Sequence, residues 1–310
     1  MAPRLLLFAL LGLSSGCAGL INNAAADALS GTGTVLSSDD DPDFIAQAVP
    51  FGLKTMDAVL ERTPEHKGLL LALASGYTQY GYAFLEEDAD RLEDDDYEAA
   101  QHLRSRARKM YERAQGYGRR LVELRSPGFF NRLEEDHEAL FSELGPEDVP
   151  ALYWTAAAWA LGVAASELDP DAIADFPLVE RMARGTLALD EDWDDGALHL
   201  LLLSIESAKP GGDLDAAAEH FERALELDGG RRAGTYVSMA GGVCVPRQDV
   251  VRFHDLLEKA IAVDEDAHPA DRLANVIMKR RAERLLEREE DLFVVSLEEA
   301  RSSTTAPRGP

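Results

Sequence analysis

Asp213-Leu-Asp-Ala-Ala-Ala-Glu-His-Phe-Glu-Arg-Ala-Leu-Glu-Leu-Asp228 is the stretch that decides the fold class of this chain of 310 residues. Its apolar positions are three or four residues apart, the spacing that places them on one face of an α-helix. They are Leu214, Ala217, Ala218, Phe221, Ala224 and Leu225. Asp213 is placed to cap the N-terminus of this helix. Gly229 and Gly230 follow its last turn, where a left-handed residue commonly ends a helix.

Parts of this stretch recur along the chain. Phe221-Glu-Arg-Ala-Leu-Glu-Leu-Asp matches Leu257-Glu-Lys-Ala-Ile-Ala-Val-Asp, and Tyr111-Glu-Arg-Ala matches its first half. Gly185-Thr-Leu-Ala-Leu-Asp190 repeats its end. The last three copies are 38 and 36 residues apart, and a period in the mid-thirties resembles tetratricopeptide repeats, whose period is about 34 and in which each unit is a helical hairpin. Because one hairpin cannot bury its apolar face alone, neighbouring hairpins must stack into a common core.

Three other stretches are apolar almost all round, at residues 69–85, 151–168 and 197–208. A helix of that kind is enclosed by other helices. The expected helices are 44–62, 69–93, 97–124, 131–144, 150–168, 173–189, 194–208, 213–227, 231–243, 249–263 and 269–290. We therefore predict an all-α fold of stacked helical hairpins, forming one domain over residues 43–295, and a loose C-terminal tail over residues 296–310.

The N-terminal segment has the layout of a secretory signal. Arg4 is followed by an apolar run from Leu5 to Leu13 and then by small residues up to Gly16. A charged start, a short apolar core and a small-residue end are typical of a signal peptide. The run is too short to cross a bilayer, which requires about 20 residues of helix. We predict a signal peptide at residues 1–16.

Small residues directly before Cys17 resemble the lipobox of bacterial lipoproteins, in which the cysteine is acylated and becomes the mature N-terminus. We expect lipidation at Cys17 and a flexible linker over residues 17–42, a segment rich in Ala, Gly, Ser, Thr and Asp. Ser14 stands where the lipobox usually has leucine. The alternative is an ordinary signal peptide with a cysteine nearby by chance.

The composition and motifs argue against several classes of function. Asp plus Glu number 57 against 31 Lys plus Arg, a net charge of −26, which repels nucleic acid. Cys244 lies in an apolar stretch and is expected to be a buried, unreactive side chain. The histidines lack zinc-ligand spacing, and the acidic cluster at residues 190–196 does not fit a calcium loop. We therefore predict no catalytic residues, no metal site and no cofactor.

Aromatic side chains gather on two of the apolar helices. Such side chains combine an apolar body with, in Tyr and Trp, a polar tip. They fit a packed core, and they equally fit a cavity or a partner surface. The candidate ligand- or partner-binding residues are Tyr77, Tyr80, Tyr82, Phe84, Tyr153, Trp154 and Trp159.

The segments Leu73-Ala-Ser-Gly-Tyr-Thr-Gln-Tyr-Gly-Tyr-Ala-Phe84 and Ala151-Leu-Tyr-Trp-Thr-Ala-Ala-Ala-Trp159, with the repeats that follow, resemble the T component of tripartite ATP-independent periplasmic (TRAP) transporters. The resemblance implies a periplasmic lipoprotein with a tetratricopeptide-like fold and no enzymatic activity. It also implies association with the extracytoplasmic solute-binding protein of the transporter. Finally, the resemblance implies a homo-oligomer, with a trimer as the first expectation. It also implies a passage for a ligand through the helical body.

The leading hypothesis is thus a membrane-anchored adaptor that docks a TRAP-type solute-binding protein and passes on a small ligand. The first alternative is a general scaffold lipoprotein for cell-envelope assembly, which differs in its partner. The second alternative is an enzyme of a type that its sequence motifs do not reveal.

Overall fold

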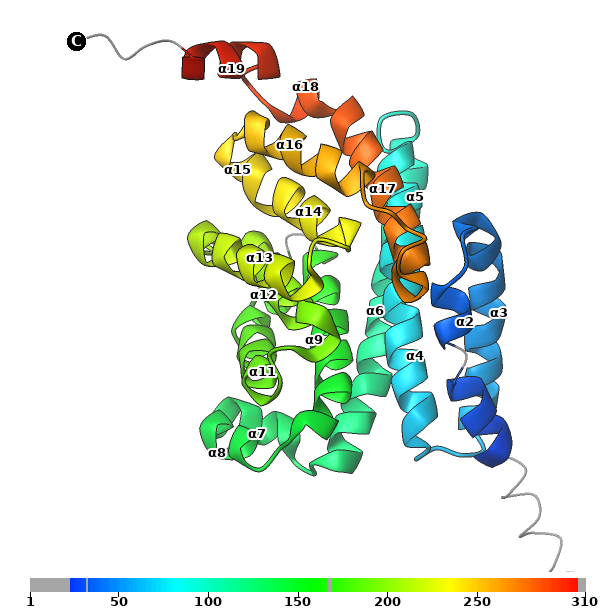
Figure 1. Cartoon of the computed structure of the whole chain (residues 1–310). Helices are drawn as coiled ribbons and strands as arrows, with labels where there is room; N and C mark the ends of the chain where they lie inside the picture. The colour runs from blue at the N-terminus through cyan, green and yellow to red at the C-terminus, as the bar shows by residue number, and fades with distance from the viewer. Residues whose placement is uncertain (1–22, 32, 167–168, 306–310) are drawn as a thin grey trace, which may run out of the picture.

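The computed structural model describes residues 23–31, 33–166 and 169–305, and within these ranges every regular element is helical (Figure 1). From Gly33 onward the α-helices are α2 (Gly33–Ser37), α3 (Pro42–Leu60), α4 (Lys67–Tyr80), α5 (Glu87–Leu92), α6 (Tyr97–Arg125), α7 (Phe129–Glu135), α8 (His137–Ser142), α9 (Val149–Ala164), α10 (Pro170–Ile173), α11 (Phe176–Leu189), α12 (Ala197–Ala208), α13 (Leu214–Asp228), α14 (Ala233–Met239), α15 (Val245–Arg247), α16 (Val250–Ile261), α17 (Arg272–Glu287), α18 (Glu289–Leu292) and α19 (Leu297–Thr305). Short π-helical segments are η1 (Gly81–Glu86) and η4 (Ala240–Cys244), and 3₁₀ segments are η2 (Pro146–Asp148), η3 (Trp193–Gly196) and η5 (Pro269–Asp271). The predicted all-α class is confirmed.

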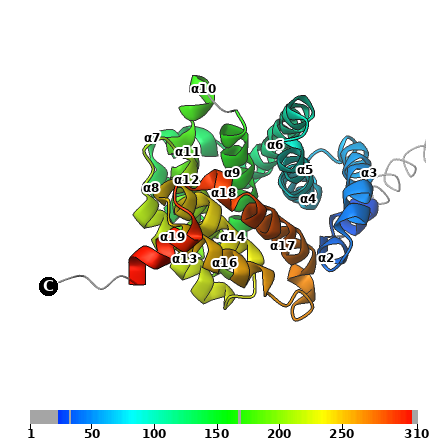
Figure 2. The ribbon, with the colours of Figure 1, turned by 90° about the horizontal axis from the view of Figure 1, so that it is seen from above.

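Most helices pack against near neighbours in the chain, as stacked hairpins require. The closest pairs are α4 with α6, α6 with α9, α9 with α11, α12 with α13, and α14 with α16. The long helix α17 departs from this order. Seen from above, it lies between α14 and α16 on one side and α2, α4 and α5 on the other (Figure 2). The C-terminal part of the repeat domain therefore packs against its N-terminal helices.

The stretch that decided the fold class forms α13 as predicted. The carboxylate of Asp213 accepts hydrogen bonds from the backbone nitrogens of Asp215 and Ala216, at 2.9 and 3.1 Å. Phe221 is only 2% exposed. Gly229 has a φ of 63°, the left-handed conformation that ends a helix at low cost when no Cβ is present.

The core consists of two large apolar clusters, and α12 lies between them. Leu202 of α12 belongs to the cluster around α4, α6, α9 and α11, whereas Leu203 belongs to the cluster around α13 to α17. A helix with a core on two sides must be apolar around most of its circumference. This arrangement accounts for the apolar sequence of residues 197–208.

Several of the expected helices differ from those observed, and two show the reasons most clearly. The helix predicted over residues 69–93 is continuous through α4, η1 and α5, but its middle is π-helical. The helix predicted over residues 131–144 is interrupted at Asp136, whose carboxylate caps α8 by accepting from the backbone nitrogen of Ala139. Aspartate is a strong N-cap, so it ends one helix and starts the next.

The terminal segments are more ordered than expected. Of the proposed linker, residues 23–30 and Gly33–Ser37 are helical, and Ala26 is fully buried. Alanine has the highest helix propensity, so the run at residues 24–26 favours helix over a flexible chain. The expected loose tail contains α19, where Ser296 and Glu299 form reciprocal capping hydrogen bonds. The signal peptide and Cys17 lie outside the described residues.

A membrane-spanning helix was not found among the described residues, since none of their helices is both long and apolar enough.

The closest approach of α6 and α9 occurs at Gly118, and it gives a first prediction. A Cβ at Gly118 would lie 2.4 Å from Thr155 Oγ1 and 3.1 Å from Thr155 Cα. We expect Gly118→Ala to destabilise the protein by at least about 1 kcal/mol, because backbone must shift to admit the methyl group. The matched control is Gly116→Ala on the same helix, where a Cβ meets nothing within 4 Å. Gly116→Ala should stabilise by up to about 1 kcal/mol through helix propensity. Urea unfolding of both variants checks this, and equal effects would contradict the packing argument.

Candidate functional site

A cluster of tyrosines occupies the interior where η1, α6 and α9 meet. This tyrosine cluster consists of Tyr82 of η1, Tyr111 of α6 and Tyr153 of α9. Tyr82 packs beside Tyr111 in one apolar group. The phenol of Tyr82 is also close enough for its charge to raise the pKa values of both Tyr111 and Tyr153, although burial is the larger cause in each case. Tyr82 and Tyr111 thus share one apolar group, and Tyr153 lies within electrostatic range of Tyr82.

The π-helical segment η1 is what directs Tyr82 and Phe84. A π-turn inserts an extra residue, so it rotates the side chains that follow, and such turns are frequent at functional sites. The Tyr82 ring faces α17, where the guanidinium of Arg281 lies 4.6 Å from the ring centre. Phe84 contacts Tyr80, with 5.8 Å between ring centres, and packs against the C-terminal core cluster. The segment thus joins the two halves of the fold.

Tyr111 is the most deeply buried member of the cluster. Its side chain is fully buried, and its hydroxyl is enclosed. A Cβ at Gly81 would lie 2.7 Å from Tyr111 Cε1, so the glycine is needed for the ring to fit. Nearby, burial raises the pKa of the Glu86 carboxyl above its usual range. After burial, the charge of Glu86 and a hydrogen bond with it also raise the pKa of Tyr111, so the Glu86 carboxyl is a polar neighbour of the Tyr111 hydroxyl.

Tyr153 lies on the other side of the cluster, against further aromatic rings. Its ring centre is 5.0 Å from that of Trp154 and 4.6 Å from that of Trp193. Burial, followed by the nearby Asp194 carboxylate, raises the pKa of Tyr153.

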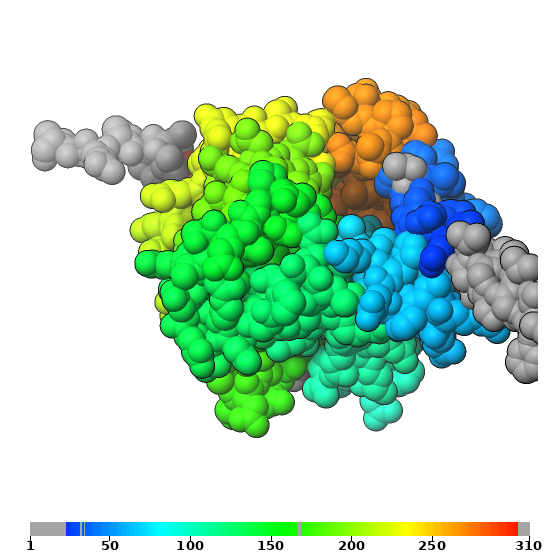
Figure 3. All heavy atoms as spheres, turned by 90° about the horizontal axis from the view of Figure 1, so that it is seen from below, coloured from blue at the N-terminus to red at the C-terminus, as the bar shows by residue number. Residues whose placement is uncertain are grey.

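The hydroxyls of the other two cluster members are less enclosed than that of Tyr111. Within the described parts of the chain, the hydroxyls of Tyr82 and Tyr153 form no hydrogen bond, yet neither is among the fully enclosed unpaired atoms. Figure 3, a view from below, shows the surface hollowed between the blue and cyan N-terminal helices, the green helices and the orange-brown α17.

The remaining candidates fall into separate environments. Tyr77 is a core residue, 2% exposed, and its hydroxyl donates to Asp57 Oδ2 at 2.7 Å. Asp57 also accepts from the hydroxyl of Tyr117 at 2.7 Å. Although burial alone would raise the pKa of Asp57, the hydrogen bonds from Lys54 and both tyrosines lower it overall. Trp159 is likewise buried, and its indole Nε1 donates to Asp175 Oδ2 at 2.9 Å. The structure thus brings Tyr82 and Tyr153 together and places Tyr77 and Trp159 elsewhere.

Sequence reasoning missed the charged residues that border the tyrosine cluster. Glu87 is 8% exposed and accepts from Arg281 Nε at 3.0 Å and from Arg284 Nη2 at 3.0 Å. These contacts join α5 to α17, nearly two hundred positions later in the chain. We call Glu87, Arg281 and Arg284 the α5–α17 clasp. Nothing in the local pattern identifies its members, since each stands in an ordinary charged helix.

The acidic cluster at residues 190–196 has a structural role. Asp194 and Asp195 adopt positive φ angles of 45° and 52°. Arg232 donates to Asp194 Oδ1 at 2.8 Å and to Asp271 Oδ1 at 3.1 Å. Arg231 also pairs with Asp195 and Asp271, so the carboxylates are neutralised by arginines. Among the described residues no group of three or more His, Cys, Asp or Glu side chains is arranged to hold a metal ion.

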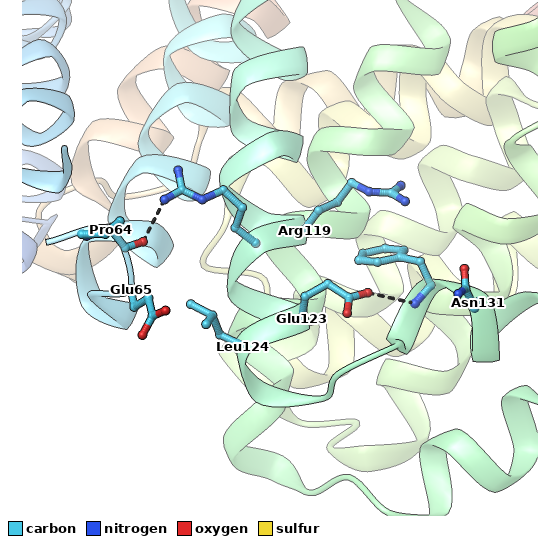
Figure 4. Close-up of a pocket in the computed structure, with 8 residues that line it drawn as sticks. Pro64, Glu65, Arg119, Glu123, Leu124 and Asn131 are labelled. Carbon is cyan, nitrogen blue, oxygen red and sulfur yellow. Dashed lines mark hydrogen bonds between the residues drawn. The ribbon is translucent and has the colours of Figure 1, made fainter.

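A surface groove of about 620 Å³ lies at the other end of α6. Pro64 and Glu65 line one side and Asn131 the other, with Arg119, Glu123 and Leu124 of α6 between them (Figure 4). Arg120 and Phe130 complete the lining. The guanidinium of Arg119 lies 3.8 Å from the centre of the Phe130 ring.

Comparison with known proteins identifies the family. The model of the family described as "TRAP transporter T-component" matches residues 38–293, which includes nearly all of the helical domain. An uncharacterized protein of Treponema pallidum (strain Nichols) is 30% identical over 271 residues, covering 84% of this chain and 83% of the relative. The chain therefore belongs to the TRAP transporter T-component family, which makes it a component of a TRAP transport system.

Proposed function

We propose that this protein is a lipid-anchored periplasmic adaptor that docks the solute-binding protein of its TRAP system. The observation that carries the proposal is the family match across residues 38–293. A stack of helical hairpins offers an extended surface suited to such docking. The anchor is a lipid on Cys17, downstream of a signal peptide at residues 1–16. The adaptor assembles as a homo-oligomer, for which a trimer is the first expectation.

We further propose that a small ligand passes through the interior beside the tyrosine cluster. Among the described residues the hydroxyls of Tyr82 and Tyr153 have no hydrogen-bond partner, and Tyr111 offers a third, enclosed hydroxyl beside Glu86. Phenol rings present apolar faces together with polar tips, the combination that suits a mainly apolar ligand with a few polar atoms. Tyr80, Phe84 and Trp154 adjoin these rings. Tyr77 and Trp159 act as packing residues in this proposal.

The docking proposal is tested by affinity capture of the full-length lipoprotein from detergent-solubilised membranes of its own organism. Bound proteins and small molecules are identified by mass spectrometry. We expect a TRAP-type solute-binding protein in the eluate, and a Cys17→Ser variant should lose the membrane fraction but keep that partner. Repeated recovery of other envelope proteins without a solute-binding protein would contradict the proposal and favour a general scaffold for envelope assembly.

A further inference from the structure

The groove beside α6 contains an arginine that the fold leaves without an acceptor. Arg119 is half-buried, and its guanidinium lies 3.8 Å from the ring centre of Phe130 and 5.3 Å from that of Trp159. It forms no hydrogen bond or ion pair with any residue that the structure describes. A stacked guanidinium keeps its N–H groups in the plane of the fork, so all of them remain available at its edge.

The two carboxylates whose charges act on Arg119 are those of Asp175 and Glu123, and both already accept hydrogen bonds from other groups. Asp175 accepts from the indole Nε1 of Trp159 at 2.9 Å. Arg120 Nη2 donates to the backbone oxygen of Pro64 at 2.8 Å. Glu123, the acid that shares the groove, accepts from the backbone nitrogens of Gly128 at 2.7 Å and Phe130 at 3.4 Å. Its carboxylate therefore satisfies the free N–H groups at the start of α7. Arg119 is thus held in place by aromatic rings, with its hydrogen-bonding edge unused.

We propose that the groove binds the carboxylate of a small organic acid on Arg119, with an apolar body of that acid against Phe130 and Leu124. A planar guanidinium matches a carboxylate through two parallel hydrogen bonds, a geometry that an ammonium group cannot offer. The groove volume of about 620 Å³ is within the range of small-molecule sites. Asn131 lies at the rim and adds an amide.

Two acids, Glu65 and Glu123, and two cations, Arg119 and Arg120, line the groove. Charges beyond about 8 Å are screened at physiological ionic strength, so Arg119 governs its immediate surroundings. This site is distinct from the tyrosine cluster and does not depend on the proposed docking function.

The test is titration of the full mature chain with phenylacetate, followed by calorimetry and ligand-observed NMR. Arg119→Gln should weaken phenylacetate binding at least about tenfold, since it removes a charge-assisted pair. Arg119→Lys keeps a charge beside Phe130 but has no fork, and should weaken binding severalfold. The matched control is Arg106→Gln, at an exposed position of the same helix, which should leave the affinity unchanged.

The neutral analogue phenylacetamide separates carboxylate recognition from apolar binding, and it should bind at least about tenfold more weakly than phenylacetate. Each variant is first shown to melt like the wild type. Equal affinity for the two probes, unchanged affinity in Arg119→Gln, or no binding of phenylacetate at millimolar concentration would overturn the proposal. Capture of the solute-binding protein by Arg119→Gln should remain normal, so failure of one proposal does not imply failure of the other.

Discussion

Replacing Glu87 with glutamine is expected to destabilise the fold by about 3–5 kcal/mol. Glu87 is 8% exposed, and it is the shared acceptor for Arg281 and Arg284 of α17. Although burial by itself raises the pKa of Glu87, the hydrogen bond from Arg284 and the charges of both arginines lower it overall. The carboxylate is therefore charged at neutral pH. Removing that charge leaves Arg281, 9% exposed, buried beside another cation, with Asp90, 3.6 Å from Arg284, as a more distant carboxylate.

Breaking the α5–α17 clasp is expected to loosen α17 from the helices on which it packs. Because α17 packs on α2, α3, α14 and α16, it holds the two ends of the repeat stack together. Urea unfolding of Glu87→Gln measures the effect. The control is Asp88→Asn on the same helix, whose partner Arg91 is 58% exposed at the side chain, so a cost within about 1 kcal/mol is expected. A Glu87→Gln cost as small as that of the control would show that the clasp contributes little to the fold.

The second large effect is a loss of stability in acid that depends on His220. His199 of α12 and His220 of α13 face each other through their Nδ1 atoms, 2.9 Å apart, so only one of these atoms can carry a hydrogen. Burial, followed by the charge of His199, lowers the pKa of His220 to about 4. Burial also lowers the pKa of His199, although Glu191 opposes this shift. Both rings are therefore neutral in the native state at pH 7.

The sign of the pH dependence follows from these shifts. The folded-state pKa of His220 is below the unfolded value of about 6.5. Its contribution to the free energy of unfolding is therefore fully present above pH 6.5. It is lost as the pH falls towards 4. We expect a loss of about 2 kcal/mol, after allowance for solvent screening of this half-buried ring.

Urea unfolding of the wild type and of His220→Gln at pH 7 and pH 4 isolates this contribution. The stability difference between the two proteins should shift in favour of the variant at low pH. His102→Gln, at an exposed position of α6, is the matched control and should track the wild type. A constant difference between wild type and His220→Gln across this range would contradict the assignment.

The helices could be predicted from the sequence because their signals are local. The cap at Asp213, the apolar stripe of α13 and the left-handed Gly229 all lie within one turn of the element that they define. The apolar character of α12 likewise followed from the sequence, and the two flanking core clusters give its reason. The capping box at Ser296 and Glu299 is also a local signal, and it favours the observed helix α19 over a loose tail.

The candidate site was less predictable, because it depends on contacts between distant segments. Tyr77 and Tyr82 are five positions apart on one continuous helical stretch, yet one donates to Asp57 in the core and the other faces Arg281. Five residues already place two side chains on different faces of a helix, so the sequence separates Tyr77 from Tyr82. What it does not show is which distant segment each of them meets. Arg119 was missed for a similar reason, since only the fold shows that it lacks an acceptor.

The measurement that tests the central claim most directly is sedimentation of the purified mature chain with the purified TRAP-type solute-binding protein from the same organism. If the protein is the docking component, the mixture contains a species heavier than either protein alone, at micromolar concentrations typical of transient complexes. Unchanged sedimentation of both proteins at those concentrations would contradict the docking role and leave the family membership without the proposed partner.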